Sequence, residues 1–290
     1  MKNMRNMIGT KMRILKSDKL KVLQFSGLSG FCNTSHFITT RHGGVSKGNY
    51  ASMNPGEYSG DDIDSVRENR KILSKGIGIS SECIYAPYQV HGCEIAELDH
   101  SFLSLSDEGR KAYIYGTDAL ITNVAGLCVA VSTADCVPVL LYAADKKVVA
   151  AVHAGWRGTV QQIVAKTLSV MVDKYGCDPS YLFAGIAPSI SGDAFEVGDE
   201  VVDAFRVSGA DMEHISFRNP ETGKAHIDLW EENRLQLVKS GVPVSQIEIS
   251  GICTYMYCDE FFSARRLGIK SGRILSGIMI KDKWYNENSI

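Results

Sequence analysis

Four short apolar runs follow one another between residues 119 and 153, and they constrain the fold more than any other feature of the chain. Each run is rich in β-branched residues and is separated from the next by a turn signal at Gly126, Asp135 or Asp145-Lys146. The pattern predicts strands over Ala119–Val124, Leu127–Ser132, Val137–Ala143 and Lys147–His153. The chain is therefore expected to be built around β-sheet.

The periodicity of the sequence changes directly after His153. Apolar side chains then recur at helical spacing from Val160 to Val172, and Gly176 is placed to end this helix. A further strand is expected over Tyr181–Ala187. Residues 147–187 therefore predict a β-α-β unit.

Helices and strands also alternate in the rest of the chain. Residues 61–76 predict a helix that starts with acids and ends at a glycine, and Asp228 with Glu231 resembles a capping box opening a helix over 229–239. Late strands are expected over Ile247–Ser250 and Arg273–Ile280. This order favours an α+β fold in which a mixed β-sheet sandwich is flanked by helices.

The length of 290 residues corresponds to one or two domains at about 150 residues each. Because no repeat or Pro-rich linker divides the chain, we expect a single domain over residues 23–290. Residues 1–22 are predicted to be a basic N-terminal tail, since they combine many Lys and Arg with one acid, Asp18. No apolar segment of the kind found in secretory signals follows them.

The charge balance excludes several classes of partner. The 31 basic and 33 acidic residues give a net charge of −2, which offers no electrostatic reason to expect nucleic-acid or membrane-surface binding. No apolar run approaches the roughly 18 residues that a membrane span needs. Eight cysteines occur without a C-x-x-C pair, so we expect reduced and mostly buried thiols in a cytoplasmic protein.

Two histidines and one cysteine stand beside predicted strand ends or turns. His91 lies in PYQVHGCE, Cys136 lies in STADCVPVLL, and His153 ends the strand KVVAAVH. Functional groups commonly gather at strand ends, so the three side chains could meet. Three protein ligands with one open position are typical of catalytic zinc. Their separations match no compact metal motif, so buried imidazoles and a core thiol remain an open interpretation.

Three segments are candidates for binding an anion. HAGWRG, residues 153–158, is a strand-to-helix turn whose N–H groups and Arg157 could hold a phosphate. FFSARR, which contains Arg265, combines aromatic and basic side chains, and Arg41 lies in the Gly-rich TRHGGVS. A tight turn, an aromatic core edge and solvated surface charges are the structural interpretations of the same segments. Gly60-Asp61-Asp62 is interpreted as the acidic start of a helix.

Longer motifs run in order from about residue 36 to residue 280: TRHGGVSKGNYASMNPG, QVHG, TDALIT, STADCVPVLL, VHAGWRG, FEVGDEV and FFSARR. Together they resemble the YfiH/YlmD-like family, which is often labelled laccase-domain or multicopper polyphenol oxidoreductase. The resemblance implies an α+β sandwich and a zinc site formed by His91, Cys136 and His153. One segment departs from the family pattern GPxIGxCCYEV, because residues 187–197 carry Asp193 and Ala194 in place of the paired cysteines.

The resemblance also implies an activity. Family members are described as purine nucleoside enzymes that phosphorolyse adenosine, inosine, guanosine and methylthioadenosine and that deaminate adenosine. The leading hypothesis is therefore a zinc-dependent purine nucleoside phosphorylase with adenosine deaminase activity, in which the three proposed zinc ligands are also catalytic. Its partners would be purine nucleosides and phosphate, with the chain a monomer or a weak homo-oligomer. The candidate substrate-binding residues are Arg41, Gln89, Arg157 and Arg265.

Three other functions stay open. In a metal-free cysteine hydrolase, Cys136 would be the nucleophile and His153 the base, with an amide such as a cell-wall precursor as substrate. The resemblance supports this reading because the family's fold is grouped with a deamidating toxin's cysteine-hydrolase domain. A copper polyphenol oxidase is disfavoured because the chain has seven histidines and no H-x-H pair, although a His₂Cys set can take up copper adventitiously. The last alternative is a non-catalytic partner-binding protein.

Overall fold

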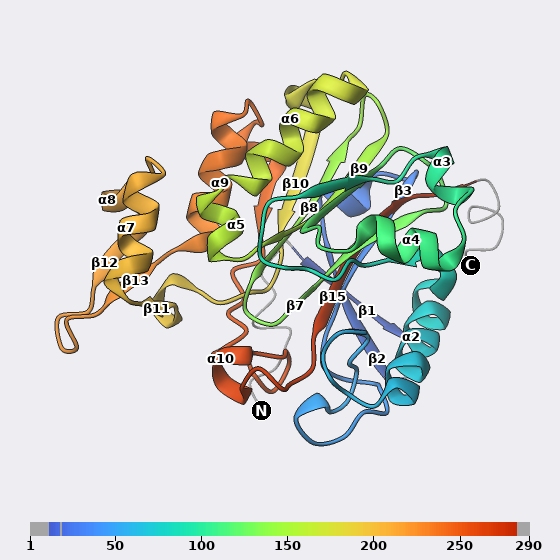
Figure 1. Cartoon of the computed structure of the whole chain (residues 1–290), viewed down its shortest axis with the longest axis horizontal. Coiled ribbons are helices and arrows are strands. Elements are labelled where there is room, and N and C mark those ends of the chain that lie inside the picture. The colour runs from blue at the N-terminus through green and yellow to red at the C-terminus, as the bar shows by residue number, and fades with distance from the viewer. Residues whose placement is uncertain (1–11, 18, 283–290) are drawn as a thin grey trace.

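Two six-stranded sheets form the centre of the molecule in the computed structural model, which describes residues 12–17 and 19–282 (Figure 1). The order of the first sheet is β1 (Met12–Ser17), β2 (Leu20–Phe25), β3 (Thr34–Thr39), β15 (Ile274–Ile280), β7 (Cys128–Thr133) and β4 (Ile84–Tyr85). The order of the second is β14 (Ile247–Ile249), β10 (Leu182–Ile186), β8 (Val137–Ala143), β9 (Val148–Ala154), β6 (Ala119–Thr122) and β5 (Ile95–Glu97). The expected α+β sandwich of mixed sheets is confirmed.

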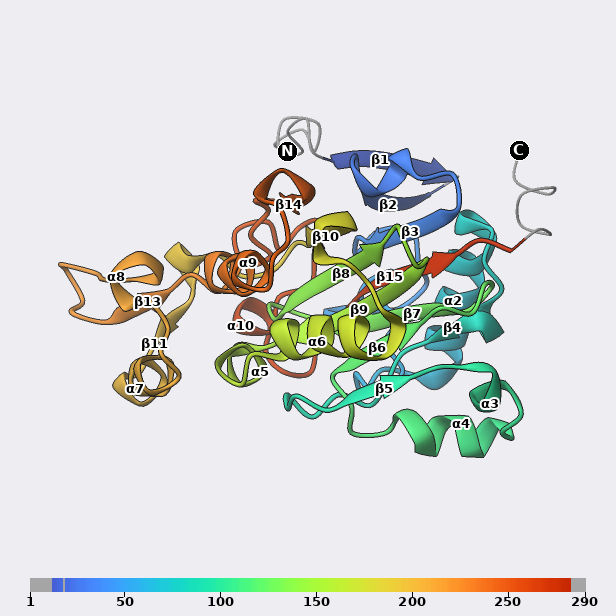
Figure 2. The ribbon, with the colours of Figure 1, turned by 90° about the horizontal axis from the view of Figure 1, so that it is seen from above.

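Helices cover the outer faces of both sheets, so the molecule has four layers (Figure 2). Helix α2 (Ile63–Ile77) packs against the first sheet, and α6 (Ile163–Tyr175) with α9 (Leu229–Lys239) packs against the second. Two shorter helices, α3 (His100–Leu103) and α4 (Asp107–Ile114), lie in the connection from β5 to β6. This covering explains why the central strands are apolar on both faces.

Strand β8 shows how one run of apolar residues serves two cores. Val139 and Leu141 point toward the core beneath α6 and α9, whereas Leu140 and Tyr142 point into the core between the two sheets. Every residue of β8 is buried, so the continuous apolar run has a physical reason. Removing Leu140 down to Ala would cost about 2–5 kcal/mol of unfolding free energy at such a site.

The predicted β-α-β unit is confirmed. Both β9 and β10 pair antiparallel to β8, so they run parallel to each other with β8 between them. The helical connection is broken, because α5 (Trp156–Val160) ends before α6 begins and Gln162 adopts a left-handed conformation with φ 61°. Gly176 ends α6 in the left-handed conformation, as expected.

The expected basic tail over residues 1–22 is wrong for its second half. Residues 12–17 and 20–25 form the antiparallel pair β1–β2, and the first eleven residues lie outside the described part of the chain. Basic side chains here alternate with the buried Met12, Leu20 and Val22. A high density of Lys and Arg is therefore the mark of a solvated edge hairpin, since edge strands are commonly protected by charge.

Two further expectations are tested by burial and helix content. All eight cysteines are unpaired and described, but only Cys128, Cys177 and Cys253 are buried, so the expectation that most are buried is wrong. None of the described helices is long and apolar enough to cross a membrane.

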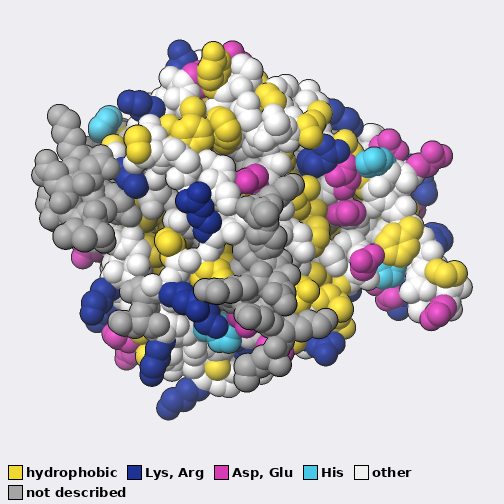
Figure 3. Space-filling model, turned by 180° about the vertical axis from the view of Figure 1, so that it is seen from behind, with side chains coloured by type: hydrophobic (Ala, Val, Ile, Leu, Met, Phe, Trp, Pro, Cys, Tyr) yellow, Lys and Arg dark blue, Asp and Glu magenta, His cyan; other side chains and the backbone are white. Residues whose placement is uncertain are grey.

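A small lobe projects from the second sheet, on the side of α9 (Figure 1). It consists of a three-stranded sheet and two helices: β11 (Glu196–Val197), β13 (Ala225–Ile227), β12 (Ser216–Arg218), α7 (Asp199–Val207) and α8 (Met212–Ile215). From behind, the lobe stands clear of the main body and carries acidic and basic side chains (Figure 3). Its strands have two or three residues each, which explains why no periodicity in the sequence indicated them.

Candidate metal centre

Several strands begin or end side by side at one end of the second sheet. The pairing of Val137 with Ala154 places the start of β8 beside the end of β9, and Ala119, at the start of β6, pairs with Val152 at the same end. Cys136 directly precedes β8, and His153 lies near the end of β9. His91 comes from the loop between β4 and β5. Three segments that are distant in sequence therefore converge here because of the sheet register.

The ligand atoms of His91, Cys136 and His153 all lie within 4.8 Å of one another. The two imidazole rings are 4.9 Å apart between centroids and meet at 75°. Donor atoms around a tetrahedral zinc ion are about 3.5 Å apart, so this cluster is close to a ligand set. The predicted convergence of the three residues is thus present in the structure, as a possible His-Cys-His metal site.

Gly155 leaves the space in which this cluster forms. A Cβ atom at this position would lie 3.1 Å from Cys136 Sγ and 3.2 Å from His91 Cδ2. Gly158 allows a second close approach, since its Cβ would lie 2.9 Å from the carbonyl oxygen of Gly92. The glycines of HAGWRG therefore let α5 pack against the QVHG loop. This packing is what the interpretation of residues 153–158 as a tight turn predicts.

The cluster also favours the ionised thiol. Burial alone would raise the pKa of Cys136, but its contacts with His153 and His91 outweigh burial and lower the pKa to about 6. Burial alone would lower the pKa of His153, but Cys136 and Asp118 outweigh it and raise the pKa to about 9. A thiolate is the form of cysteine that binds metals and acts as a nucleophile.

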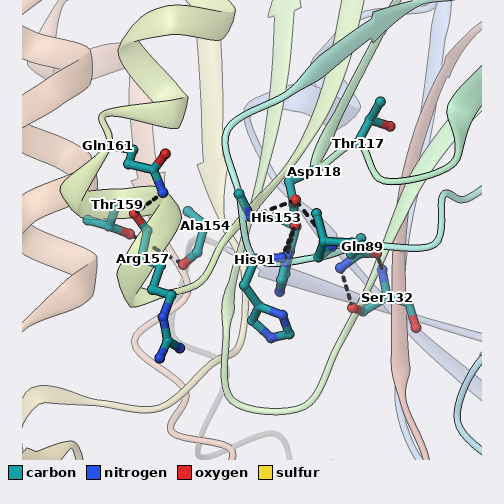
Figure 4. A network of polar contacts seen from close by, with 12 residues as sticks. Gln89, His91, Thr117, Asp118, Ser132, His153, Ala154, Arg157, Thr159 and Gln161 are labelled. Carbon is teal, nitrogen blue, oxygen red and sulfur yellow. Dashed lines mark hydrogen bonds and ion pairs between the residues drawn. The ribbon is translucent and has the colours of Figure 1, made fainter.

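Asp118 organises two of the three residues at once, as the dashed contacts in Figure 4 show. Its carboxylate lies 2.7 Å from Nδ1 of His153 and accepts backbone N–H groups from Val90, His91 and Gly92. Burial would raise the pKa of Asp118, but the contact with His153 and the N–H donors hold it below its usual range. A carboxylate behind a ligating imidazole fixes the orientation of the ring and raises its basicity.

Backbone strain accompanies this geometry. His91 has φ 62° and Asp135 has φ 84°, both in the left-handed region that non-glycine residues seldom adopt. The Asp135 carboxylate accepts the Thr254 hydroxyl and the Arg265 backbone N–H, both at 2.7 Å. Asp135 thus turns the chain into Cys136 and ties that turn to the C-terminal segment.

A cavity of about 340 Å³ opens beside the three residues. Gln89 lies in its wall, but both groups of its side-chain amide are bonded to the backbone of Ser132, at 2.7 and 2.8 Å (Figure 4). Gln89 therefore joins the QVHG loop to β7. The lining residues are Tyr58, Pro87, Tyr88, Gln89, His91, Ser132, Thr133, Ala134, Cys136, His153, Ala264, Ile269 and Arg273.

The three arginines expected to bind phosphate do not line this cavity. Arg41 donates to the carbonyls of Ala51 and Cys258 and lies over the ring of Phe262. The guanidinium of Arg157 lies over its neighbour Trp156, at 4.3 Å from the ring centroid. Arg265 donates to the Glu196 carbonyl, in the lobe. Their expected role in substrate binding stays a prediction.

Arg273 is the cation that the sequence analysis missed. Arg273 lines the cavity, and its guanidinium donates to the carbonyls of Ser271, Gly272 and Ile269. Two of its five N–H groups have no partner in the described part of the chain. Burial lowers the pKa of Arg273, and nearby Cys136 raises it. Its position as the first residue of a predicted strand, Arg273–Ile280, gave no sign of this role.

Two smaller interpretations can now be compared with the structure. Asp62 caps α2 by accepting the Ser65 N–H, and Asp61 accepts the Ser46 hydroxyl, so the acidic start of this helix is confirmed. The departing residues Asp193 and Ala194 lie in a short turn at the base of the lobe. Neither is among the residues that line the cavity.

The fold and the cluster of His91, Cys136 and His153 define an α+β protein with a candidate His-Cys-His metal site where the two sheets meet. Residues 35–281 match the family model described as multi-copper polyphenol oxidoreductase laccase, and the chain belongs to this family. It is 52% identical over 260 residues to a purine nucleoside phosphorylase of Bacteroides thetaiotaomicron, covering 90% of this chain and 96% of the relative.

Two other relatives extend the comparison. The chain is 42% identical over 245 residues to "Adenosine deaminase RL5" from an unknown prokaryotic organism, covering 84% of this chain and 93% of that protein. The crystal structure of YlmD from Geobacillus stearothermophilus superimposes with a TM-score of 0.82 at 32% identity, over 92% of this chain and 98% of that one. The resemblance to the YfiH/YlmD-like family is confirmed.

Proposed function

We propose that this chain is a zinc-dependent purine nucleoside phosphorylase. The observation that carries the proposal is the cavity in which His91, Cys136 and His153 stand beside a half-buried arginine. A volume of about 340 Å³ lies in the range of small-molecule sites, which begins at about 300 Å³. The names of the relatives supply the reaction class.

The donor set fits zinc, because imidazole and thiolate are its usual ligands and the two neighbouring imidazoles lower the pKa of Cys136 to about 6. Zinc bound there would supply a Lewis acid and lower the pKa of a coordinated water. Asp118 would keep His153 in the tautomer that presents Nε2 to the cluster, since Nδ1 faces the carboxylate. A cytoplasmic location suits a thiolate ligand, which needs reducing conditions.

Arg273 supports the phosphate half of the reaction. In phosphorolysis, a phosphate oxygen forms a bond to C1′ of the ribose while the C1′–N9 bond breaks, and the purine leaves with a proton. The free N–H groups of Arg273 would bind the phosphate dianion and orient it toward C1′. Inosine, guanosine, adenosine and methylthioadenosine share this bond and are the proposed substrates.

Adenosine deamination is the second proposed activity, because a relative with 42% identity is named an adenosine deaminase. Water would add at C6 of adenine and ammonia would leave. For deamination, the cavity must let the C6 edge of the adenine base reach the His-Cys-His cluster, which the ribose approaches in phosphorolysis. Phosphorolysis of adenosine releases adenine and deamination gives inosine, so the amounts of adenine and inosine formed with and without phosphate separate the two activities.

One observation also favours a cysteine hydrolase. The pKa of Cys136 lies near 6 beside the His153 imidazole, as in nucleophilic thiolate–imidazole pairs. In this alternative, the thiolate would attack an amide carbonyl and the imidazolium would protonate the leaving amine. Activity that survives chelation and is lost on thiol alkylation would select it.

The deciding experiment measures metal content and turnover in one preparation. Protein purified without added metal is expected to hold about one zinc per chain by elemental mass spectrometry and to convert inosine and phosphate to hypoxanthine. Chelation and Cys136→Ala should each abolish turnover, and Cys32→Ala, at an exposed thiol, should not. Copper in place of zinc with phenol oxidation, or turnover that ignores chelation, would contradict the proposal.

A further inference from the structure

Three tyrosines form an aromatic cluster at the mouth of the cavity. Tyr88 and Tyr115 stack with centroids 4.9 Å apart and planes 2° apart, and Tyr58 meets Tyr88 edge to face at 5.0 Å. Their exposed fractions are 51% for Tyr58, 38% for Tyr88 and 62% for Tyr115. Aromatic rings left this exposed in a folded chain are typical of a surface that receives a partner.

The cluster belongs to the same cavity as the metal centre. Tyr58 and Tyr88 line the wall that also holds His91 and Cys136, and Tyr88 precedes the QVHG loop by one residue. Tyr115 stacks on Tyr88 but is not in the lining, so it supports the Tyr88 ring. The aromatic surface therefore faces whatever molecule reaches the three candidate ligands.

An exposed apolar side chain stands in the same lining. Ile269 is 81% exposed, although it belongs to the wall of the cavity. Its carbonyl accepts Nη2 of Arg273 at 3.0 Å, so the loop that carries it is fastened to the cavity cation. The cavity wall thus combines the exposed Tyr58, Tyr88 and Ile269 with the polar side chains of His91, Cys136, His153 and Arg273.

We propose that Tyr58 and Tyr88, together with Ile269, hold the purine base by ring contact at the mouth of this cavity. The inference rests on the proposed function, since it names the place of the base within that site. The ribose and the phosphate then lie toward Arg273 and the His-Cys-His cluster. Every purine has a π-face, so this contact admits adenine, hypoxanthine and guanine alike.

Equilibrium binding of inosine without phosphate tests the proposal, because phosphorolysis cannot then proceed and inosine has no amine to lose. Titration calorimetry on the zinc-loaded full chain should show that Tyr88→Ala weakens inosine binding about ten-fold or more. Tyr88→Phe keeps the ring and should bind within about two-fold of the wild type. Tyr181 is 55% exposed and directly precedes β10, at the end of that strand away from the cavity. Tyr181→Ala should therefore bind inosine like the wild type.

Kinetics supply the second readout. With phosphate present, Tyr88→Ala should raise KM for inosine by the same factor and leave kcat within about two-fold, since ring contact is made equally in the ground and transition states. KM for phosphate should not change. A methyl ribofuranoside, which has no base, should not bind to any variant.

The outcomes separate this inference from the proposed function. If the wild type performs phosphorolysis but Tyr88→Ala keeps the wild-type affinity, the base lies elsewhere and only this inference is overturned. Equal losses in Tyr88→Phe and Tyr88→Ala would assign the contact to the hydroxyl and overturn it as well. Inosine binding that depends on Tyr88, without turnover under any metal loading, would support the aromatic site and reject phosphorolysis.

Discussion

His36 and His153 are both 2% exposed, yet their surroundings favour a neutral imidazole in His36 and a protonated imidazole in His153. His36 lies on β3, accepts the Phe25 N–H at Nε2 and stacks against the Phe25 ring. Burial lowers its pKa to about 3. His153 is equally buried, but Cys136 and Asp118 overcome burial and raise its pKa to about 9. The groups that contact a buried histidine, and not how deeply it is buried, therefore determine whether its imidazole is neutral or protonated.

The largest effect is expected from removing the carboxylate that distinguishes His153 from His36. Asp118→Ala leaves a buried imidazole and three backbone N–H groups without their acceptor, so unfolding free energy should fall by about 3–5 kcal/mol. Metal affinity should fall about ten- to a hundred-fold. Urea unfolding and competitive zinc titration measure the two effects. Asp173→Ala, at an exposed carboxylate of α6, should stay within about 0.5 kcal/mol, and an equal loss there would contradict the special role of Asp118.

His36 predicts a dependence of stability on pH. The unfolded chain binds a proton to this residue below about pH 6.5, whereas the folded chain does so only near pH 3. Stability from His36 is therefore complete above pH 6.5 and is lost as pH falls toward 3, at up to about 1.4 kcal/mol per pH unit. His36→Gln should reduce this slope in urea unfolding between pH 6 and 4. An unchanged slope would show that His36 is protonated in the fold.

The space at Gly155 can be tested on its own. Gly155→Ala places a methyl group 3.1 Å from Cys136 Sγ, so the cluster must spread and zinc affinity should fall roughly ten-fold. Gly30→Ala is the matched control, because its Cβ meets nothing within 4 Å. Competitive chelator titration of the three proteins gives the comparison. Wild-type affinity in Gly155→Ala would mean that the donors do not need this gap.

The smallest effect concerns thiol reactivity in metal-free protein. Cys136 should react with iodoacetamide at a rate that rises around pH 6, because its contacts with His153 and His91 outweigh burial. Cys128 should stay unreactive, since burial raises its pKa well above the usual range. Peptide mapping by mass spectrometry between pH 5 and 9 resolves the two sites. If the alkylation rate of Cys136 instead rose with a midpoint near pH 9, its histidine neighbours would not lower its pKa. That result would contradict the proposed difference between the surroundings of His153 and His36.

The central strands and the convergence of His91, Cys136 and His153 are the parts that could be predicted. The run Val137–Ala143 matches β8 at both ends, because a strand buried on both faces is apolar throughout and turn residues bound it. His91, Cys136 and His153 stood out by their places at strand ends, and family motifs joined them. Spacing alone could not join them, since the sheet register brings together residues that lie far apart in sequence.

Other parts were hidden for physical reasons. The pair β1–β2 mixes basic and apolar residues at an edge, so its charge suggested a tail. The sequence singles out His153 by its strand end and the HAGWRG turn, but it does not give the charge state of His153 or of His36, because tertiary contacts supply their partners. Arg273 is defined by the cavity that it enters, and the prominent arginines of HAGWRG and FFSARR lie over aromatic rings instead.

The position of β15 has a consequence for biosynthesis. This strand follows all the others in the sequence, yet it is paired on both edges, with β3 and with β7. A ribosome must therefore have made some 280 residues before the first sheet can close, and Arg273 reaches its place only then. Until that moment, β3 and β7 expose unpaired edges, which are sites of aggregation in nascent chains. Premature termination anywhere before β15 would yield a chain in which neither the first sheet nor the cavity is complete.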